Sequence, residues 1–208
     1  MTFGRDATPY KSFDEFLVDL EAIDWSVGIG PHQGVEALLR RLHRDRTALK
    51  ERVRSWKPGG ERRISRETST HYKWFVHEDQ DQRFTLWLHE YKPAGVRGTR
   101  HAVIPHNHRY WFSSLMLAGG FTSTSFRARV GRPGVIPADR LSVAAGDVFT
   151  IPPDEIHALE AIEDGTLTLI VQGRPVRNYS EVYEPETGKT TRFYDMVARL
   201  PELQDRVT

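Results

Sequence analysis

The stretch that decides the fold is Ile104-Pro105-His106-Asn107-His108, together with residues 146–157, which read GDVFTIPPDEIH. Side chains two residues apart on a β-strand point to the same side of a sheet, so His106 and His108 are expected to face the same way. In the second stretch a glycine turn, a short apolar strand and a Pro-Pro bend precede His157. We predict that the bend brings His157 into a small β-barrel opposite the first pair, where the three imidazoles hold a divalent metal.

The composition of the 208-residue chain limits its class. The formal net charge of +1 creates no large field toward nucleic acid or an anionic membrane, so neither is expected as a partner. Cysteine is absent, which rules out disulfides, thiolate metal ligands and a cysteine nucleophile. The first ten residues show no signal-peptide pattern, and no apolar run approaches the roughly 20 residues that cross a bilayer. We therefore expect a soluble, cytoplasmic protein.

Two amphipathic helices are predicted at the N-terminus. Residues 12–25 begin with a capping box, Ser12 followed by Glu15, and carry apolar residues at helical spacing. Residues 34–56 predict one longer helix that ends before Pro58. The opposite face of this helix is rich in arginine and lysine. We expect a solvated face there, and an anion- or partner-binding surface is the alternative.

After Gly60 the apolar period changes from that of a helix to that of a strand. Short strands separated by glycine, proline and aspartate turns predict an antiparallel barrel or sandwich. The expected strands are 68–77, 83–91, 99–104, 110–117, 121–130, 140–143, 148–151, 156–162 and 167–172. The tail, 178–194, contains further strand-like pieces, and a short helix is expected from Asp195. We divide the chain into an N-terminal helical segment, 1–60, a barrel, 61–194, and a C-terminal tail, 195–208.

The two histidine stretches resemble the paired metal-binding motifs of the cupin superfamily, and the resemblance spans roughly residues 68–172. The first family motif is His-x-His, usually followed four or five residues later by a glutamate and then a glycine. The second is Gly-x5-Pro-x-Gly-x2-His. The matching residues here are His106, His108, Gly119, Gly146, Pro152 and His157, with Asp154 in place of the second motif's later glycine. The resemblance implies a mainly β fold: a cupin (double-stranded β-helix, or jelly-roll) barrel with two N-terminal α-helices.

The glutamate ligand of the common cupin motif is missing, because Phe112 and Ser113 occupy the expected spacing. Among cupins, a three-histidine set resembles the thiol dioxygenases of the cysteine dioxygenase type. That resemblance implies Fe(II) as the metal, with Zn, Ni, Mn or Co as alternatives. An iron held by three imidazoles leaves about three of six positions open to substrate and dioxygen.

The chain departs from the thiol dioxygenases at three places. Trp74 stands where that family has the arginine that holds the substrate carboxylate. Ser113 stands where it has a cysteine that crosslinks to a tyrosine, and Gln172 falls near its catalytic tyrosine. Cysteine is therefore not expected as the substrate.

Other residues are candidates for handling a substrate. Tyr110, Ser113 and Gln172 lie on predicted strands beside the ligands and could orient substrate or hydrogen-bond a reacting group; ordinary barrel filling is the alternative. Arg100 could bind a carboxylate bidentately, although surface exposure explains it equally well. Tyr72, Trp87 and His89 could line the barrel mouth or belong to the core.

The sequence thus predicts a mononuclear non-haem Fe(II) oxygenase that acts on a small polar, thiol- or amino-acid-like molecule with dioxygen. One alternative is a Zn- or Ni-dependent cupin lyase, isomerase or hydrolase. Another is a cupin that binds a ligand without turnover. Cupins often pair through barrel edges, so the resemblance also implies a homodimer. Fold class alone does not select among these reactions, because one fold hosts many chemistries.

Overall fold

The computed structural model describes residues 8–26, 32–57, 65–98, 102–194 and 204–206. Three helices precede the strands: α1 (Phe13–Glu21), α2 (His32–Arg44) and α3 (Thr47–Arg54). The strands are β1 (Arg66–Glu67), β2 (His71–Glu78), β3 (Phe84–Tyr91), β4 (Phe112–Ala118), β5 (Gly120–Ala128), β6 (Val135–Ala144), β7 (Val148–Ile151), β8 (Ile156–Glu160), β9 (Leu167–Gly173), β10 (Tyr179–Tyr183) and β11 (Thr190–Tyr194).

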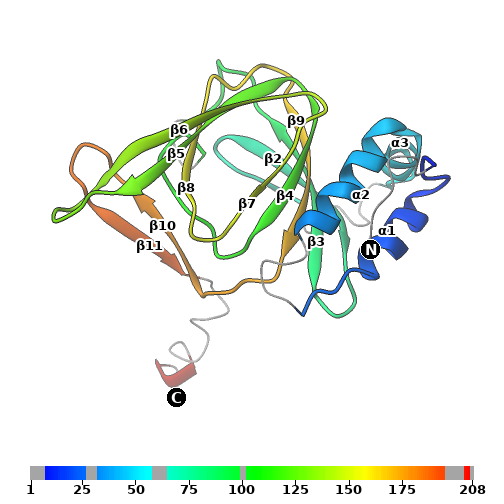
Figure 1. The fold of residues 1–208 in the computed structure, drawn as a ribbon, viewed down its shortest axis with the longest axis horizontal. Helices are drawn as coiled ribbons and strands as arrows, with labels where there is room; N and C mark the ends of the chain where they lie inside the picture. The colour runs from blue at the N-terminus through cyan, green and yellow to red at the C-terminus, as the bar shows by residue number, and fades with distance from the viewer. Residues whose placement is uncertain (1–7, 27–31, 58–64, 99–101, 195–203, 207–208) are drawn as a thin grey trace.

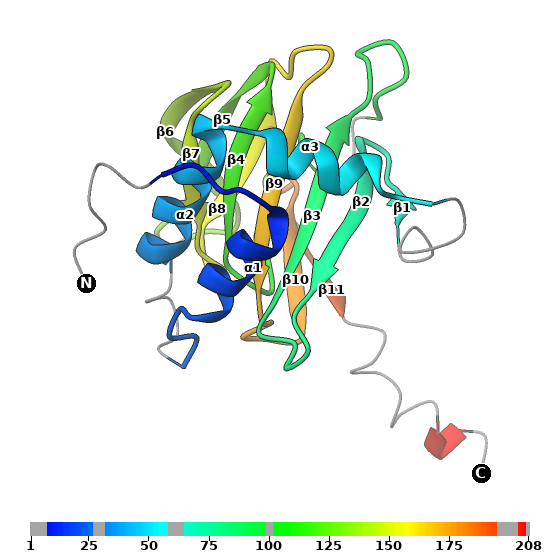
Figure 2. The same cartoon turned by 90° about the vertical axis from the view of Figure 1, so that its right-hand side faces the viewer.

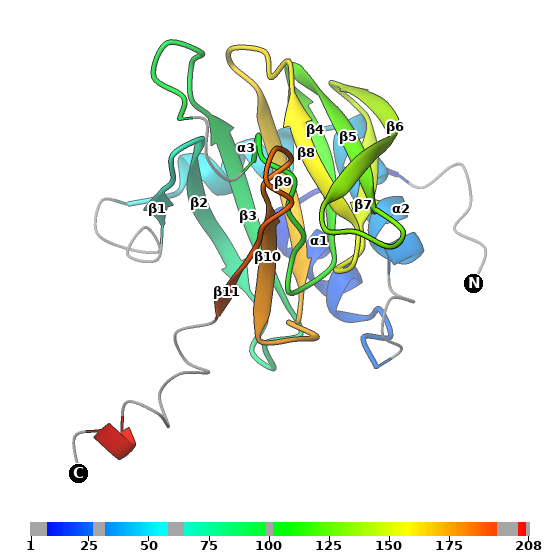
Figure 3. The same cartoon turned by 90° about the vertical axis from the view of Figure 1, so that its left-hand side faces the viewer.

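The strands form two antiparallel sheets that face each other around the barrel interior (Figure 1). One sheet has six strands in the order β1-β2-β3-β9-β4-β7. Opposite it lie the three-stranded sheet β6-β5-β8 and the hairpin β10–β11, which Figure 3 shows on the side away from the helices. This arrangement confirms the predicted mainly β class, an antiparallel barrel preceded by helices.

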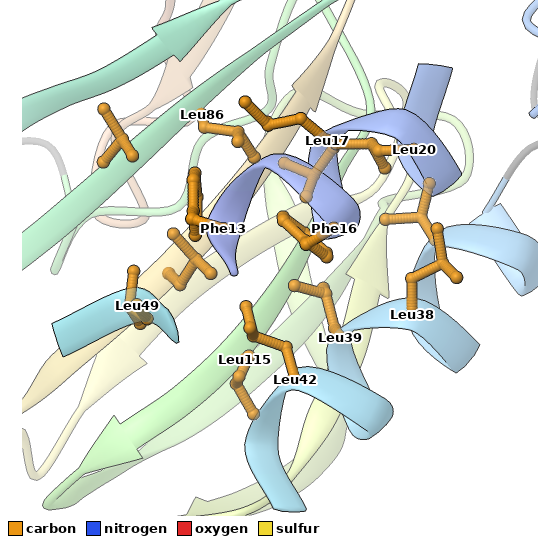
Figure 4. Close-up of a cluster of buried hydrophobic side chains, with 14 of the residues drawn as sticks. Phe13, Phe16, Leu17, Leu20, Leu38, Leu39, Leu42, Leu49, Leu86 and Leu115 are labelled. Atoms are coloured by element: carbon orange, nitrogen blue, oxygen red, sulfur yellow. The ribbon is translucent and has the colours of Figure 1, made fainter. Parts of the chain in front are cut away.

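The helices cover the outer face of the six-stranded sheet (Figure 2). Helix α1 begins where Ser12 Oγ accepts a hydrogen bond from the backbone N–H of Glu15 at 3.3 Å, as the capping box predicted. Its buried residues and those of α2 pack on alternate residues of the strands, with Phe16, Leu39 and Leu115 almost fully buried between the layers (Figure 4). Because side chains alternate along a strand, the other residues of β3 and β4 point into the barrel.

The predicted long helix over 34–56 is two helices. Helix α2 ends at Arg44, and α3 begins at Thr47. The side chain of Asp45 explains the break, since its Oδ1 accepts a hydrogen bond from the Thr47 backbone N–H at 2.9 Å. A short acidic side chain that bonds the backbone in this way competes with a continuous helix.

Two arginines on the basic face of these helices contact the six-stranded sheet instead of solvent alone. Arg46 donates a hydrogen bond to the carbonyl of Leu117 at 2.5 Å, and Arg52 donates one to the carbonyl of Val76 at 3.1 Å. These arginines therefore bond the helices to the backbone of the sheet below them. The prediction of a merely solvated face is wrong for these two side chains.

The strand predicted over 99–104 is wrong in the part that the structure describes. Residues 102–105 form turns and bends, and the chain reaches β4 through an irregular segment that contains the first two histidines. The terminal helix predicted from Asp195 begins outside the described residues. Within the described chain, no helix has the length and apolar character needed to cross a membrane.

Candidate metal centre

Backbone pairing fixes the first histidine of the site. The His106 N–H donates to the His157 carbonyl, and the His157 N–H donates to the His106 carbonyl, both at 2.9 Å. On its other side His106 forms an isolated bridge with Val182 of β10. The short segment around His106 therefore lies between β8 and β10 and connects the three-stranded sheet to the hairpin. Strand parity predicted that His106 and His108 face the same way. In the structure, the segment is held by the pairing of His106 with His157 on one side and Val182 on the other.

The side chain between the two histidines holds the segment in register. Asn107 is buried, and its Oδ1 accepts a hydrogen bond from the Glu181 backbone N–H at 2.8 Å. Its Nδ2 donates to Glu181 Oε2 and to the Tyr183 hydroxyl, each at 3.3 Å. Because Asn107 points toward β10, its two neighbours are turned the other way, toward the barrel interior.

The three predicted ligands converge. His106, His108 and His157 each offer a ring nitrogen, and these atoms lie within 4.8 Å of one another. His108 Nε2 lies 2.9 Å from His157 Nε2. Two nitrogens that each lie about 2.1 Å from one ion are about 3.0 Å apart at an octahedral angle and about 3.4 Å apart at a tetrahedral angle. The donor set suits a divalent metal, and this spacing fits two ligands of one ion. The spacing also suits an N–H···N hydrogen bond between the rings, and metal analysis separates the two.

Hydrogen bonds and burial prepare the rings for a metal. His106 Nδ1 lies 2.8 Å from the Ile104 carbonyl, which requires a proton on Nδ1 and leaves the lone pair on Nε2. Burial lowers the pKa of both His108 and His157 well below the usual value, and the neighbouring imidazoles lower it further. The rings of His108 and His157 are therefore neutral near pH 7, and neutral imidazole is the form that binds a metal.

An arginine joins the two histidine-bearing segments. The Arg177 guanidinium donates to the His108 carbonyl at 2.7 Å and to the Pro153 carbonyl at 2.5 Å. One planar side chain thereby holds the backbone that follows the first motif against the bend that precedes His157. This contact could not be predicted from sequence, because the two carbonyls are distant along the chain.

The histidines open on a cavity of about 80 Å³ inside the barrel. Much of its wall is apolar and includes Phe112, Phe149 and Ile170. A wider hollow of about 680 Å³ shares part of this lining and extends past β1 and β10. The two spaces form an inner chamber with an outer approach.

Of the predicted substrate-handling residues, Tyr110 and Gln172 line the inner chamber. Ser113 does not, because its hydroxyl points toward the helices and lies 2.6 Å from Thr150 Oγ1, which in turn donates to Glu36 of α2. The adjacent Ser114 lines the chamber instead. The prediction that Ser113 points inward is therefore wrong by one residue of strand parity.

Trp87 and Tyr72 lie apart from the chamber wall. Trp87 is buried in the barrel among Phe75, Phe112 and Ile170, behind the lining. Tyr72 is 36% exposed and borders a shallow surface hollow beside Trp74. Arg100 lies outside the described residues. The structure therefore supports neither Tyr72 nor Trp87 as a direct wall of the chamber.

Two chamber residues were missed by the sequence interpretation, His71 and Lys73, whereas His89 lines the chamber as one of its alternatives proposed. Lys73 pairs with His89 across β2 and β3, and the rings of His71 and His89 stack with centroids 4.2 Å apart. The available signal was the alternation of His71 and Lys73 with the aromatic Tyr72 and Trp74 along one strand. Alternation along β2 defines two faces but does not say which of them lies inside the barrel. Tyr72, on the aromatic face, was a predicted candidate for the barrel mouth.

No family model matches the chain, and no curated protein matches it. Among solved structures the chain is similar to KdgF from Halomonas sp., with a TM-score of 0.37 and 18% identity, covering 53% of this chain and 87% of that one. It is also similar to the 7S globulin of Momordica charantia, with a TM-score of 0.41, 15% identity and coverage of 62% and 34%. The capsular polysaccharide assembling protein CapF from Staphylococcus aureus gives a TM-score of 0.38, 17% identity and coverage of 64% and 32%. The chain spans about a third of the last two proteins, and no activity is inferred from any of the three.

Proposed function

We propose that this protein is a mononuclear non-haem Fe(II) enzyme that uses dioxygen to oxidise a small polar substrate. The observation that carries the proposal is the convergence of three imidazoles at the inner chamber. Within the described residues, the group contains these three histidines and no carboxylate. Fe(II) bound there would supply dioxygen chemistry and would leave about three coordination positions for exogenous ligands.

The chain's own residues would bind the substrate and keep water away from it. The apolar wall formed by residues such as Phe112, Phe149 and Ile170 would exclude water from the reacting groups. Burial raises the pKa of Tyr110, so its phenol stays protonated and can donate a hydrogen bond into the chamber. The side-chain oxygen of Gln172 accepts a hydrogen bond from Lys73 Nζ at 3.2 Å, which fixes the orientation of the amide.

A second candidate is a redox-neutral enzyme with Zn or Ni at the same histidines, acting as a lyase, isomerase or hydrolase. Lys73 favours this alternative because burial lowers its pKa to about 7. A group with that pKa is suited to accept and return a proton near neutral pH. Dioxygen consumption distinguishes the two reactions, since only the oxidative one requires it.

The test is elemental analysis of the purified protein beside His157→Ala, with His32→Ala on α2 as a matched control outside the site. We expect the wild type and the control to carry one transition metal per chain and His157→Ala to lose most of it. Iron-loaded wild type is then tested for dioxygen uptake with a panel of thiols and amino acids.

Each outcome decides a different part of the proposal. A wild-type protein that contains no transition metal and takes up none contradicts the metal centre. A protein that binds zinc alone and shows no dioxygen uptake when loaded with iron contradicts the oxygenase and leaves the redox-neutral candidate. Tight substrate binding without turnover under any metal would indicate a ligand-binding protein.

A further inference from the structure

The chamber contains a buried amine without a counter-ion. Lys73 is 6% exposed, and it lies on β2 opposite His89 of β3. Within the described part of the chain, the neutral amide of Gln172 is its sole hydrogen-bond partner, and no carboxylate pairs with it. Its Nζ also lies 4.2 Å from the centroid of the Trp87 ring. A buried ammonium is ordinarily paired with an acidic group, so burial without one favours the uncharged amine, whereas the Trp87 ring face attracts the cation.

A second lysine in the same sheet shows the usual solution. Lys92 is 8% exposed, and its Nζ lies 2.5 Å from Glu67 Oε1. It also approaches an aromatic ring, that of Tyr72, at 5.2 Å. The two lysines therefore share burial and an aromatic neighbour, and they differ in the carboxylate. Lys92 is a matched internal control for Lys73.

The charged and titratable groups around Lys73 also disfavour its ammonium form. Arg66 of β1 and Arg109 of the histidine segment repel a positive charge at Nζ, after burial as the larger effect. The imidazoles of His89 and His108 also lie near Lys73, and both are kept neutral because burial lowers their pKa. Burial and these two cations together hold the pKa of Lys73 at about 7, so about half of the side chains are free amine at neutral pH.

We propose that Lys73 is a nucleophilic amine that forms an imine with a small carbonyl compound in the chamber. In this step Nζ attacks the carbonyl carbon and a C–N bond forms. The carbonyl oxygen leaves as water, taking up two protons in place of the two that the nitrogen loses. The step needs no oxidant, reductant or metal, so it goes beyond the proposed oxidation and stands independently of it.

The shape of the chamber limits the carbonyl compound. A volume of about 80 Å³ has room for several water molecules, or for a ligand of roughly half a dozen non-hydrogen atoms. A short aldehyde or ketone fits, and a longer substituent could extend into the outer hollow, which Lys73 also lines. The apolar wall keeps water from the C=N bond and so slows its hydrolysis.

The experiment is reductive trapping with propanal and cyanoborohydride at pH 7, in the presence of a chelator that removes metal. Reduction of the imine adds a hydride and a proton and leaves an N-propyl group, which peptide mass analysis assigns to a residue. We expect Lys73 to be modified at least about 10-fold faster than Lys92, because only about one in 10³ ordinary lysines is uncharged at this pH. Lys73→Arg should lose the modification of that peptide.

Two substitutions at the neighbouring amide separate chemistry from mere accessibility. Gln172→Glu places a carboxylate beside Nζ, so it should hold the ammonium and slow the trapping of Lys73 at least about 10-fold. Gln172→Leu removes the same amide without adding a charge, so it should be trapped at least about 10-fold faster than Gln172→Glu. Equal rates at Lys73 and Lys92, or a Gln172→Glu variant that is trapped as fast as wild type, would overturn the proposal. Metal content plays no part in this readout, so the imine and the oxygenase can fail separately.

Discussion

Removing the side chain of Asn107 tests whether the contact with β10 positions the histidines. Asn107→Ala deletes three hydrogen bonds, one from the Glu181 backbone N–H at 2.8 Å and two that the amide donates at 3.3 Å. Net contributions of about 1 kcal/mol each give a loss of about 3 kcal/mol. For a chain of this size that loss corresponds to a decrease of about 6–12 °C in Tm.

The assay is urea unfolding of Asn107→Ala beside Asn178→Ala, which changes an exposed asparagine. With an m-value of about 2 kcal/mol per M, the midpoint of Asn107→Ala should fall by about 1.5 M. The control should stay within about 0.5 kcal/mol of wild type. Metal affinity should fall by about 10- to 100-fold in Asn107→Ala, as it does when residues that orient ligands are removed.

Two results would refute this reasoning in different ways. An Asn107→Ala variant as stable as its control would show that the buried amide does not hold the segment on β10. A destabilised variant with unchanged metal affinity would show that the backbone bridge between His106 and His157 is sufficient to position the ligands.

Three further changes test other parts of the molecule. Arg177→Met should cost about 2 kcal/mol in urea unfolding, because it removes charged donors from two backbone carbonyls, whereas Arg132→Met in the exposed turn before β6 should cost less than about 0.5 kcal/mol. The hydrogen bonds from Arg83 lower the pKa of the buried Asp79 carboxyl, so their stabilisation is present above about pH 4 and is lost as pH falls through the folded-state pKa. Urea midpoints between pH 5 and 3 should therefore fall less steeply in Arg83→Met, and an unchanged slope would contradict this. Leu39→Ala in the fully buried layer under α2 should cost about 2–5 kcal/mol, and a loss below about 1 kcal/mol would contradict the packing.

The fold was predictable because apolar periodicity and turn residues are local signals. The strand over 148–151 was predicted at its observed bounds, and the capping box at Ser12 marked the start of α1. The break at Asp45 was missed because helical periodicity continues across it, and only the side-chain bond to Thr47 reveals the interruption. Local pattern gives the elements, and a single competing hydrogen bond decides where one of them ends.

The convergence of the candidate ligands was predicted correctly from strand parity, although the first two do not lie on a regular strand. His106 and His108 face the chamber, but they lie on an irregular segment whose direction depends on Asn107 and β10. Ser113 was misassigned by one residue because strand parity requires a known inner face, and apolar residues lie on both faces of β4. A strand covered by helices on one side and facing a barrel interior on the other gives no alternation of apolar and polar residues.

The two sheets supply different chemistry to the same chamber. The imidazoles come from β8 and from the segment that bridges β8 to β10, whereas Lys73 and Gln172 come from β2 and β9 of the six-stranded sheet. The contacts that orient the imidazoles run to β10, and the contacts of Lys73 run to Gln172 and Trp87, so the two sets share no hydrogen-bond partner. Substitutions at Asn107 and at Gln172 should therefore change metal affinity and amine reactivity independently. Coupling above about 0.5 kcal/mol between them in a double-mutant cycle would mean that the sheets move together when the chamber is filled.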